Sequence, residues 1–190
     1  RGIFVINELP DLQARIQVAL FNILEEGDVQ IRGFKLRLPL DILFVFTANP
    51  EDYTNRGSIV TPLKDRIESQ LLTHYPKSLE QALEITEQEA VIDKDQQSRV
   101  EISDLVKRLI EQVAFEARNS ELVDKKSGVS ARLTISAFEN AISAAERRAI
   151  INQEKRTQVW ISDLAGIIPS ITGKVELVYE GEQEGPFQVA

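Results

Sequence analysis

Residues 2–8 have the sequence Gly-Ile-Phe-Val-Ile-Asn-Glu, and residues 41–50 have the sequence Asp-Ile-Leu-Phe-Val-Phe-Thr-Ala-Asn-Pro. In each stretch a short apolar run of strand length ends in polar side chains, Asn7 and Glu8 in the first and Asn49 in the second. Continuous apolar runs without alternation are typical of parallel strands buried on both faces. We therefore predict two buried strands that present polar side chains at their carboxyl ends.

The segments around these two strands alternate between helical and extended patterns. Apolar residues recur at helical spacing over residues 10–27, where Gly27 is expected to end the helix. Residues 29–39 alternate apolar and charged side chains and predict a hairpin. Residues 50–61 predict a loop, which a short helix at 63–68 and a last strand near 71–75 follow. Strands that alternate with helices predict an α/β layer with a parallel sheet.

Beyond residue 76 the pattern becomes helical throughout. Ser78 and Gln81 predict a capping box at the start of one helix, and Ser103 is expected to cap a second helix. We predict the fold class as α/β, a partial parallel-sheet core, followed by an all-α helical domain. The expected division places the core at residues 1–76 and the helical domain at residues 77–190.

The helical domain is expected to continue with two more helices and a tail. One helix carries an apolar stripe over residues 138–149, and another begins near Ser162 and is interrupted at Pro169. Trp160 is expected to pack beneath this domain. The tail after Lys174 is rich in glutamate and is expected to be extended.

Composition excludes several classes of function. The 190 residues contain 22 Lys and Arg against 30 Asp and Glu, for a net charge of −8, which disfavours a general nucleic-acid-binding surface. There is no cysteine, so disulfides and thiol chemistry are excluded, and a reducing, cytoplasmic location is expected. The apolar run at residues 42–46 is far shorter than the roughly 20 residues that span a membrane, so no membrane association is expected. Because the sequence begins on Arg1 without an initiator Met, we expect further residues upstream.

The two strand ends resemble elements of AAA+ ATPases. Ile6-Asn7-Glu8 is similar to the Walker B element, and Thr47-Ala48-Asn49-Pro50 is similar to the sensor-one strand. The resemblance implies that Asn7 holds Mg²⁺ through water, that Glu8 polarises the attacking water, and that Asn49 helps to orient it. Walker B usually has Asp where this chain has Asn7, so the charge at the metal position is absent.

Two arginines match the same family. Residues 62–66, Pro-Leu-Lys-Asp-Arg, resemble the stretch whose arginine reaches the nucleotide of the neighbouring subunit, which implies that role for Arg66. Residues 128–132, Gly-Val-Ser-Ala-Arg, resemble the sensor-two entry to a lid helix, where Arg132 would contact the γ-phosphate. The order and approximate spacing of the four elements favour the AAA+ interpretation more than any one of them does.

The hairpin at residues 29–39 narrows the resemblance to the magnesium-chelatase and MoxR-type group. This resemblance implies a homo-oligomeric ring, most often a hexamer, that uses ATP and Mg²⁺ to remodel a partner, in some relatives one with a von Willebrand factor A domain. The Gly-x-x-x-x-Gly-Lys-Ser/Thr loop that binds phosphates is absent from the 190 residues, and this chain alone is expected to be inactive. Two alternatives stay open: a non-hydrolysing adaptor, favoured by Asn7, and an AAA+ transcription regulator, which the acidic tail disfavours.

Each of these residues also has a purely structural interpretation. Apolar strands that end in a polar pair are common, Asn49-Pro50 can be a simple turn, and Arg66 can form a surface salt bridge. His74 has no second histidine with which to bind a metal. Two charged pairs, Glu25-Glu26 and Arg147-Arg148, are expected on solvated helix faces.

Overall fold

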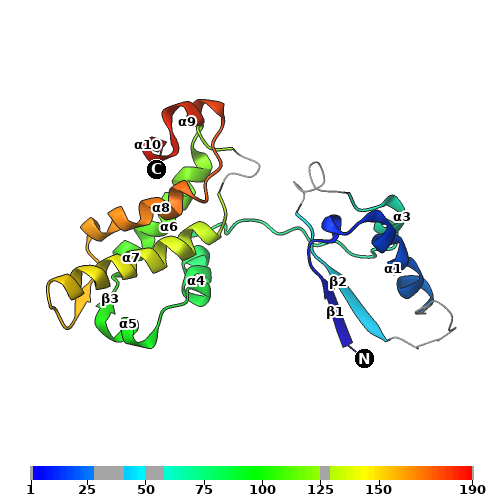
Figure 1. Ribbon diagram of the computed structural model, residues 1–190, viewed down its shortest axis with the longest axis horizontal. Coiled ribbons are helices and arrows are strands. Elements are labelled where there is room, and N and C mark those ends of the chain that lie inside the picture. The colour runs from blue at the N-terminus through cyan, green and yellow to red at the C-terminus, as the bar shows by residue number, and fades with distance from the viewer. Residues whose placement is uncertain (1, 28–40, 50–57, 125–128, 190) are drawn as a thin grey trace. The chain divides into compact units, whose positions relative to one another are not determined.

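A computed structural model describes residues 2–27, 41–49, 58–124 and 129–189 of the protein. The chain forms two compact units, Arg1–Thr73 and His74–Ala190 (Figure 1). The first contains the paired apolar strands and the second is helical, which confirms the predicted fold class. The hairpin expected at residues 29–39, with the basic residues Arg32, Lys35 and Arg37, lies outside the described residues.

The first unit is built on one pair of parallel strands. Strand β1 (Gly2–Ile6) pairs with β2 (Ile42–Phe46), with Gly2 opposite Ile42 and Ile6 opposite Phe46. Apolar runs of this length favour strands, and the parallel direction brings both carboxyl ends to the same edge. Figure 1 shows the two strands side by side, with helices α1 (Ala14–Glu26) and α3 (Thr61–Lys64) in the same unit.

The expectation that both strands are buried is wrong for the part of the chain that the structure describes. Ile3 is 70% exposed and Leu43 is 61% exposed. Among the described residues this sheet has only two strands. Each strand therefore has a neighbouring strand on one side only, and the apolar side chains on the sheet remain exposed to solvent. The predicted strand near residues 71–75 is also wrong, because this segment forms no strand and Leu71 is 93% exposed.

The predicted first helix is divided in two. Residues Leu9–Asp11 form a single 3-10 turn, η1, with Pro10 near its start. Leu12 then adopts an extended conformation, so the α-helix begins only at Ala14. Gly27 ends α1 as expected, with a φ of 61° that glycine adopts without a steric penalty.

The second unit contains most of the helices. Both predicted serine caps are confirmed: the Ser78 hydroxyl accepts from the Gln81 amide at 3.3 Å, and the Ser103 hydroxyl accepts from the Val106 amide at 3.4 Å. The elements in chain order are α4 (Leu79–Glu89), α5 (Lys94–Arg99), β3 (Val100–Glu101), α6 (Asp104–Asn119), α7 (Arg132–Ile151), β4 (Thr157–Gln158), η2 (Ile161–Ile167), α8 (Ile168–Thr172), α9 (Tyr179–Glu184) and α10 (Pro186–Val189).

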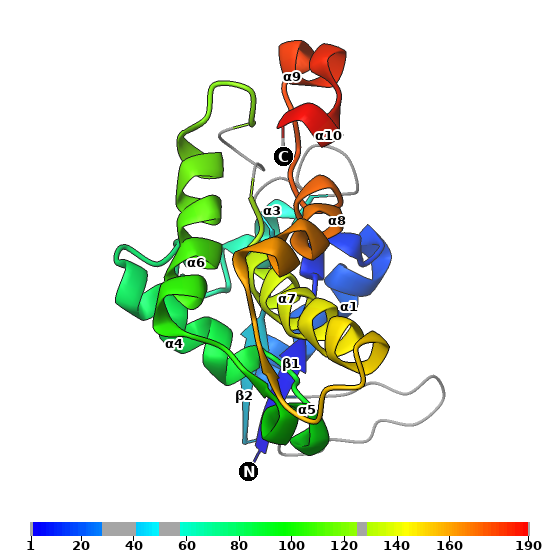
Figure 2. The ribbon, with the colours of Figure 1, turned by 90° about the vertical axis from the view of Figure 1, so that its left-hand side faces the viewer.

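Helix α7 is the centre of this unit. Among the described helices it has the most buried residues, and it contacts α4 and α6 as well as η2 and α8. Figure 2 shows α7 between these two groups of elements. The apolar stripe predicted over residues 138–149 is confirmed as the core face of α7, with Phe138, Ala141, Ile142, Ala145 and Ala149 buried.

Three expectations about the end of the chain need correction. Trp160 is 53% exposed, because it lies at the N-cap of η2 and offers its backbone amide, rather than its ring, to the buried Asp163. Pro169 lies in the first turn of α8 and therefore begins a helix instead of interrupting one. The tail is extended only where Val175 and Leu177 form isolated bridges, and α9 and α10 follow.

One arginine expected on a solvated face is a structural contact. The guanidinium of Arg148 binds Asp163 with two nitrogens, Nε to Oδ1 at 3.0 Å and Nη2 to Oδ2 at 2.9 Å. Nη2 also donates to the Gln158 carbonyl at 2.8 Å. Arg148 therefore joins α7 to β4 and η2, whereas its neighbour Arg147 is exposed as expected.

In the part of the chain that the structure covers, no helix combines the length and the apolar character needed to cross a lipid bilayer.

Candidate functional site at the carboxyl edge of the strand pair

The polar residues that follow β1 and β2 meet through one threonine. The ladder continues one step beyond the strands, because the Thr47 amide donates to the Ile6 carbonyl at 3.0 Å and the Leu9 amide donates to the Thr47 carbonyl at 2.9 Å. The Thr47 hydroxyl donates to Oδ1 of Asn7 and accepts from the Glu8 amide at 2.9 Å. A single side chain on one strand end thus orients both polar residues on the other.

The backbone of Glu8 is held in an unusual conformation. Its φ of 52° and ψ of 56° place it in the left-handed region. Among the described residues other than glycine, only Gln153 also has a positive φ. For a residue with a Cβ this conformation costs about 1 kcal/mol or more, so surrounding contacts must maintain it. The hydrogen bonds that the amides of Glu8 and Leu9 donate to the hydroxyl and the carbonyl of Thr47 provide those contacts. The 3-10 turn η1 begins at the next residue, Leu9.

Asn49 lies at the same edge, three residues beyond the end of β2. Asn7, Glu8 and Asn49 are all solvent-accessible. Because β1 and β2 are parallel and in register, the residues that follow them share one edge of the sheet. The structure therefore brings together Asn7, Glu8 and Thr47 by direct hydrogen bonds and places Asn49 on the same edge.

Arg66 is engaged within its own unit. Its Nη2 lies 2.8 Å from Oε1 of Glu25, and its Nη1 donates to the Pro62 carbonyl at 2.7 Å. The guanidinium also stacks on Phe21, 4.8 Å from the ring centre. These contacts are the salt bridge of the purely structural interpretation, and they assign Glu25 a partner that the sequence did not indicate. The proposed role across a subunit interface stays a prediction.

Gln17 is a structural residue of this site that the sequence pattern did not indicate. It is 1% exposed, and its side chain makes three hydrogen bonds to backbone. Nε2 donates to the carbonyls of Leu12 at 2.8 Å and Ser58 at 3.1 Å, while Oε1 accepts from the Val60 amide at 2.9 Å. Gln17 thereby attaches the segment before α3, and with it Arg66, to α1. The available signal was a glutamine within an otherwise apolar stretch of helix.

Arg132 belongs to the second unit, where it is the first residue of α7 and is exposed. Its amide donates to the Ser130 hydroxyl at 3.1 Å, which compensates for the absence of a side-chain cap from Ala131. Its carbonyl accepts from Nζ of Lys174 at 3.3 Å. Gly128, at the start of the sensor-two resemblance, lies outside the described residues.

The oxygen atoms at the strand edge are suitable ligands for a hard cation that is also coordinated by water and phosphate. Asn7, Glu8 and Thr47 offer an amide, a carboxylate and a hydroxyl oxygen, the ligand class that Mg²⁺ prefers. Within the described ranges no group of three or more His, Cys, Asp or Glu residues could hold a metal by itself. This composition fits a Mg²⁺ ion that keeps several water ligands and is bound largely by a nucleotide.

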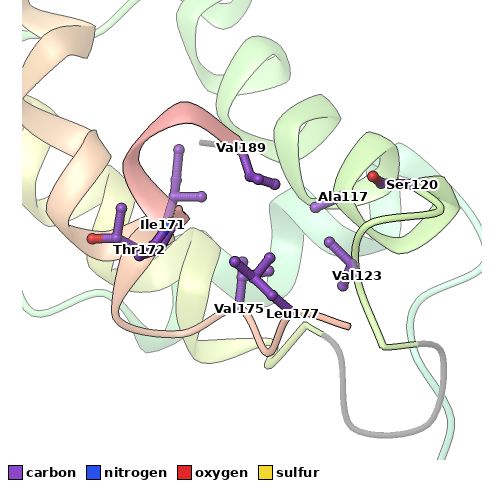
Figure 3. A pocket seen from close by; sticks show the side chains of 9 residues that line it. Ala117, Ser120, Val123, Ile171, Thr172, Val175, Leu177 and Val189 are labelled. Atoms are coloured by element: carbon purple, nitrogen blue, oxygen red, sulfur yellow. The ribbon is translucent and has the colours of Figure 1, made fainter. Parts of the chain in front are cut away.

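The apolar cavity in the second unit is not a nucleotide site. Its volume is about 50 Å³, and Figure 3 shows that aliphatic side chains from the end of α6, from α8 and from the C-terminal segment line it. Ligand pockets usually measure about 300–1,000 Å³. This cavity therefore has room for a few water molecules and not for a nucleotide.

Among the comparisons with known proteins, the comparison with solved structures finds distantly similar chains. No family model and no curated protein matches the chain. The chain is similar to the crystal structure of a "putative ATPase" from Cytophaga hutchinsonii, with 20% sequence identity and a TM-score of 0.37. The similarity covers 96% of this chain and 61% of that chain. A similarity of this size establishes neither a shared fold nor a shared activity.

Proposed function

We propose that this chain is the later part of an AAA+ ATPase that resembles the magnesium-chelatase and MoxR-type group and couples ATP hydrolysis to remodelling of a partner protein. The observation that carries the proposal is the arrangement at the carboxyl edge of β1 and β2. There Thr47 orients Asn7 and Glu8, and Asn49 lies on the same edge. Ligands of α/β sheets bind outside the carboxyl ends of their strands, which supports this edge as the nucleotide site.

The proposal assigns each residue a role. Glu8 accepts a hydrogen bond from the attacking water and polarises it, while Asn49 orients that water. Asn7 would hold Mg²⁺ through water molecules, and the ion would supply positive charge to the phosphates. Arg66 and Arg132 add fixed positive charge to the phosphoryl group as negative charge develops on it.

Hydrolysis under this proposal requires a phosphate-binding loop, which these 190 residues do not contain. We use "full-length protein" for this chain joined to the segment that supplies the loop. The 190 residues alone are expected to bind ATP weakly at most and not to hydrolyse it.

The test is the ATP turnover of the full-length protein with Glu8→Gln, with Glu26→Gln as the matched control. Both changes replace a carboxylate with an amide at an exposed position, and Glu26 lies at the far end of α1. Glu8→Gln should lower turnover by at least about 10²-fold and leave nucleotide binding intact, because general-base contributions reach this size. Equal turnover in the two variants would refute the proposed site.

Asn7 supports a second candidate, a nucleotide-binding module that does not hydrolyse ATP. An amide at the metal position carries no negative charge, and its Oδ1 already accepts a hydrogen bond from Thr47. In that case the wild-type protein would bind ATP and show a turnover no higher than that of Glu8→Gln.

The assembly and partner are part of the same proposal. We propose a homo-oligomeric ring, most simply a hexamer, and a partner with a von Willebrand factor A domain. Sedimentation of the full-length protein with and without ATP tests the ring, because a monomer at all concentrations would contradict it.

A further inference from the structure

Three helices of the second unit meet at a buried polar cluster that the proposed site does not include. It consists of Thr86 on α4, Glu111 on α6 and Thr134 on α7, of which Glu111 is only 2% exposed. The Thr86 hydroxyl donates to Oε1 of Glu111 at 2.5 Å and lies 3.0 Å from the Thr134 hydroxyl. The three side chains form one connected set of hydrogen bonds across the helix interface.

Burial of this cluster carries an unfavourable free energy of desolvation. Desolvation by burial raises the pKa of Glu111, and the hydrogen bonds from Thr86 and Thr134 and the attraction of Arg118 oppose this shift without cancelling it. Buried carboxyl groups are generally less favourable than apolar side chains of similar volume. Because a buried Glu111 does not stabilise the helix interface, its presence there indicates a role other than stability.

The cluster lies beside the start of the helix that carries Arg132. Thr134 is the third residue of α7, and its hydroxyl is also 3.3 Å from the Ala131 carbonyl. From another element, Nζ of Lys174 donates to the Ser136 hydroxyl at 2.5 Å and to the Arg132 carbonyl at 3.3 Å. The first turn of α7 is thus fixed by side chains from α4 and α6 and from the segment after α8.

We propose that Thr134, through its contacts with Thr86 and Glu111, is a positioning residue for Arg132. The cluster fixes the rotation and the axial position of the first turn of α7, and these determine where the guanidinium of Arg132 lies. The inference rests on the proposed function, because it concerns the orientation of the Arg132 guanidinium toward a bound phosphate. It adds Thr86, Glu111 and Thr134 to the residues on which turnover depends, although none of them touches the substrate.

Thr134→Val tests this inference, with Thr134→Ser as the rescue and Thr172→Val as the matched control. Valine keeps the shape of threonine and removes the hydroxyl. Thr172 also bonds a carbonyl three residues earlier, that of Pro169, but it lies on α8 outside the cluster. In the full-length protein, Thr134→Val should lower kcat by about tenfold or more with KM nearly unchanged, because small misplacements of positioned groups cost up to about 10²-fold. Thr134→Ser should restore most of kcat, and Thr172→Val should leave it unchanged.

Hydrogen exchange gives a second measurement that does not need activity. Amides of the first turn of α7, residues 133–136, should exchange faster in Thr134→Val than in wild type or Thr172→Val. If Thr134→Val does not fold, Thr86→Val replaces it, because it removes the hydroxyl that joins Glu111 to Thr134, and the same two changes are expected.

The outcomes separate this inference from the proposed function. If Arg132→Ala abolishes turnover and Thr134→Val leaves both kcat and exchange unchanged, the positioning role is wrong and the proposed function stands. If Arg132→Ala leaves turnover unchanged, both the role of Arg132 and its positioning are refuted. A loss of kcat in Thr172→Val equal to that in Thr134→Val would likewise overturn the inference, because the effect would then not be specific to the cluster.

Discussion

At the scale of single residues, the hydroxyl of Thr47 connects the two strand ends. It donates to Asn7 and accepts from the amide of Glu8, whose backbone lies in the left-handed region. A threonine contributes both a donor and an acceptor from one oxygen, which serine can also do and valine cannot. The geometry of the candidate base thus depends on a residue that would not itself touch the nucleotide.

Thr47→Val should weaken both the fold and the activity. Each lost hydrogen bond contributes about 1 kcal/mol, so we expect a decrease of about 1–2 kcal/mol in the free energy of unfolding. Turnover of the full-length protein should fall because Glu8 loses the contact that holds its amide. Urea denaturation and ATP turnover measure the two effects, and Thr47→Ser should retain both properties. Full activity in Thr47→Val would show that the orientation of Glu8 does not depend on this hydroxyl.

Asn7→Asp should be tolerated in the full-length protein. A carboxylate accepts from the Thr47 hydroxyl at least as well as an amide does, and it adds the negative charge that suits a hard cation. We expect the Mg²⁺ concentration for half-maximal turnover to decrease. A titration of turnover against Mg²⁺ measures this change. Loss of hydrolysis in a folded Asn7→Asp protein would place Asn7 away from the metal.

The sequence was sufficient to identify the polar residues at the strand ends but not the residues that orient them. Asn7, Glu8 and Asn49 follow apolar runs, and this pattern can be recognised from the sequence alone. The role of Thr47 depends on the parallel register, which places it next to Asn7. The role of Gln17 depends on contacts with a segment some 40 residues away. Partners of that kind are set by tertiary structure, so a single sequence does not reveal them.

At the scale of elements, the pair of Arg148 and Asp163 connects α7 to the 3-10 segment η2. Burial raises the pKa of Asp163, but the hydrogen bonds from Arg148 and from the Trp160 amide and the attraction of Arg148 outweigh it, so the net pKa is lowered. A carboxyl whose pKa is lowered by folding stabilises the native state above its unfolded pKa. That contribution is lost as the pH falls through the folded pKa.

Asp163→Asn should therefore destabilise the protein at neutral pH by about 1–3 kcal/mol, because the two hydrogen bonds from Arg148 lose their charged acceptor while Glu154, 3.7 Å away, remains as a counter-ion. The difference between wild type and variant should shrink as the pH falls below the usual aspartate range, because the wild-type carboxyl becomes protonated. Thermal unfolding at a series of pH values measures it. A difference that stays constant down to strongly acidic pH would contradict the assigned pKa direction.

Glu111→Gln should show the opposite dependence. The pKa of Glu111 is raised by desolvation, so the native state favours the protonated carboxyl, and stability is lost as the pH rises through the folded pKa. Arg118, from the same helix, is the charged group that acts on Glu111, and Thr86 and Thr134 face it from α4 and α7. Relative to wild type, Glu111→Gln should gain stability from acidic toward neutral pH, as measured by unfolding at several pH values. Glu116→Gln, an exposed residue on the same helix, should show no such gain.

Helices with local signals were predictable, whereas elements that depend on distant partners were not. Ser78 and Ser103 act within a few residues of their own position, and the stripe on α7 has helical spacing, so these elements are confirmed. A strand needs a neighbour, and residues 71–75 form none within the described part of the chain. The tail departs from an extended form because Val178 donates to the Leu122 carbonyl and Gly181 lies against the same residue.

At the scale of the whole molecule, the two units differ in how much apolar surface they cover. The second unit has a contiguous core around α7. In the first unit the described residues leave Ile3, Phe4, Val5 and Leu43 largely exposed on the strand pair. Exposed apolar strands of this kind are unfavourable for an isolated chain. The first unit is therefore the part whose stability is expected to depend most on additional structure.

The proposed ring makes the last prediction, which concerns two residues on opposite sides of one interface. Glu8→Gln removes the water-polarising carboxylate of a subunit, and Arg66→Ala removes the positive charge supplied to its neighbour. Each change should abolish turnover of the full-length protein, and the loss from the arginine can reach about 10³–10⁵-fold. In a mixed ring, a subunit with Arg66→Ala has an intact Glu8 and receives Arg66 from a Glu8→Gln neighbour. Mixing the two inactive proteins should therefore restore part of the wild-type rate.

The contacts of Arg66 in this structure supply the decisive control. Arg66 binds Glu25 and the Pro62 carbonyl and stacks on Phe21. A purely structural role for Arg66 is therefore the alternative to a role across the subunit interface. If that role explains the loss, Glu25→Gln should lower turnover as much as Arg66→Ala does, and the mixture should stay inactive at every ratio. If Arg66 acts across the interface, Glu25→Gln should retain turnover, because it frees the guanidinium without removing it. Subunit exchange, followed by fluorescence transfer between labelled proteins, must occur in both cases for the mixture to distinguish these roles.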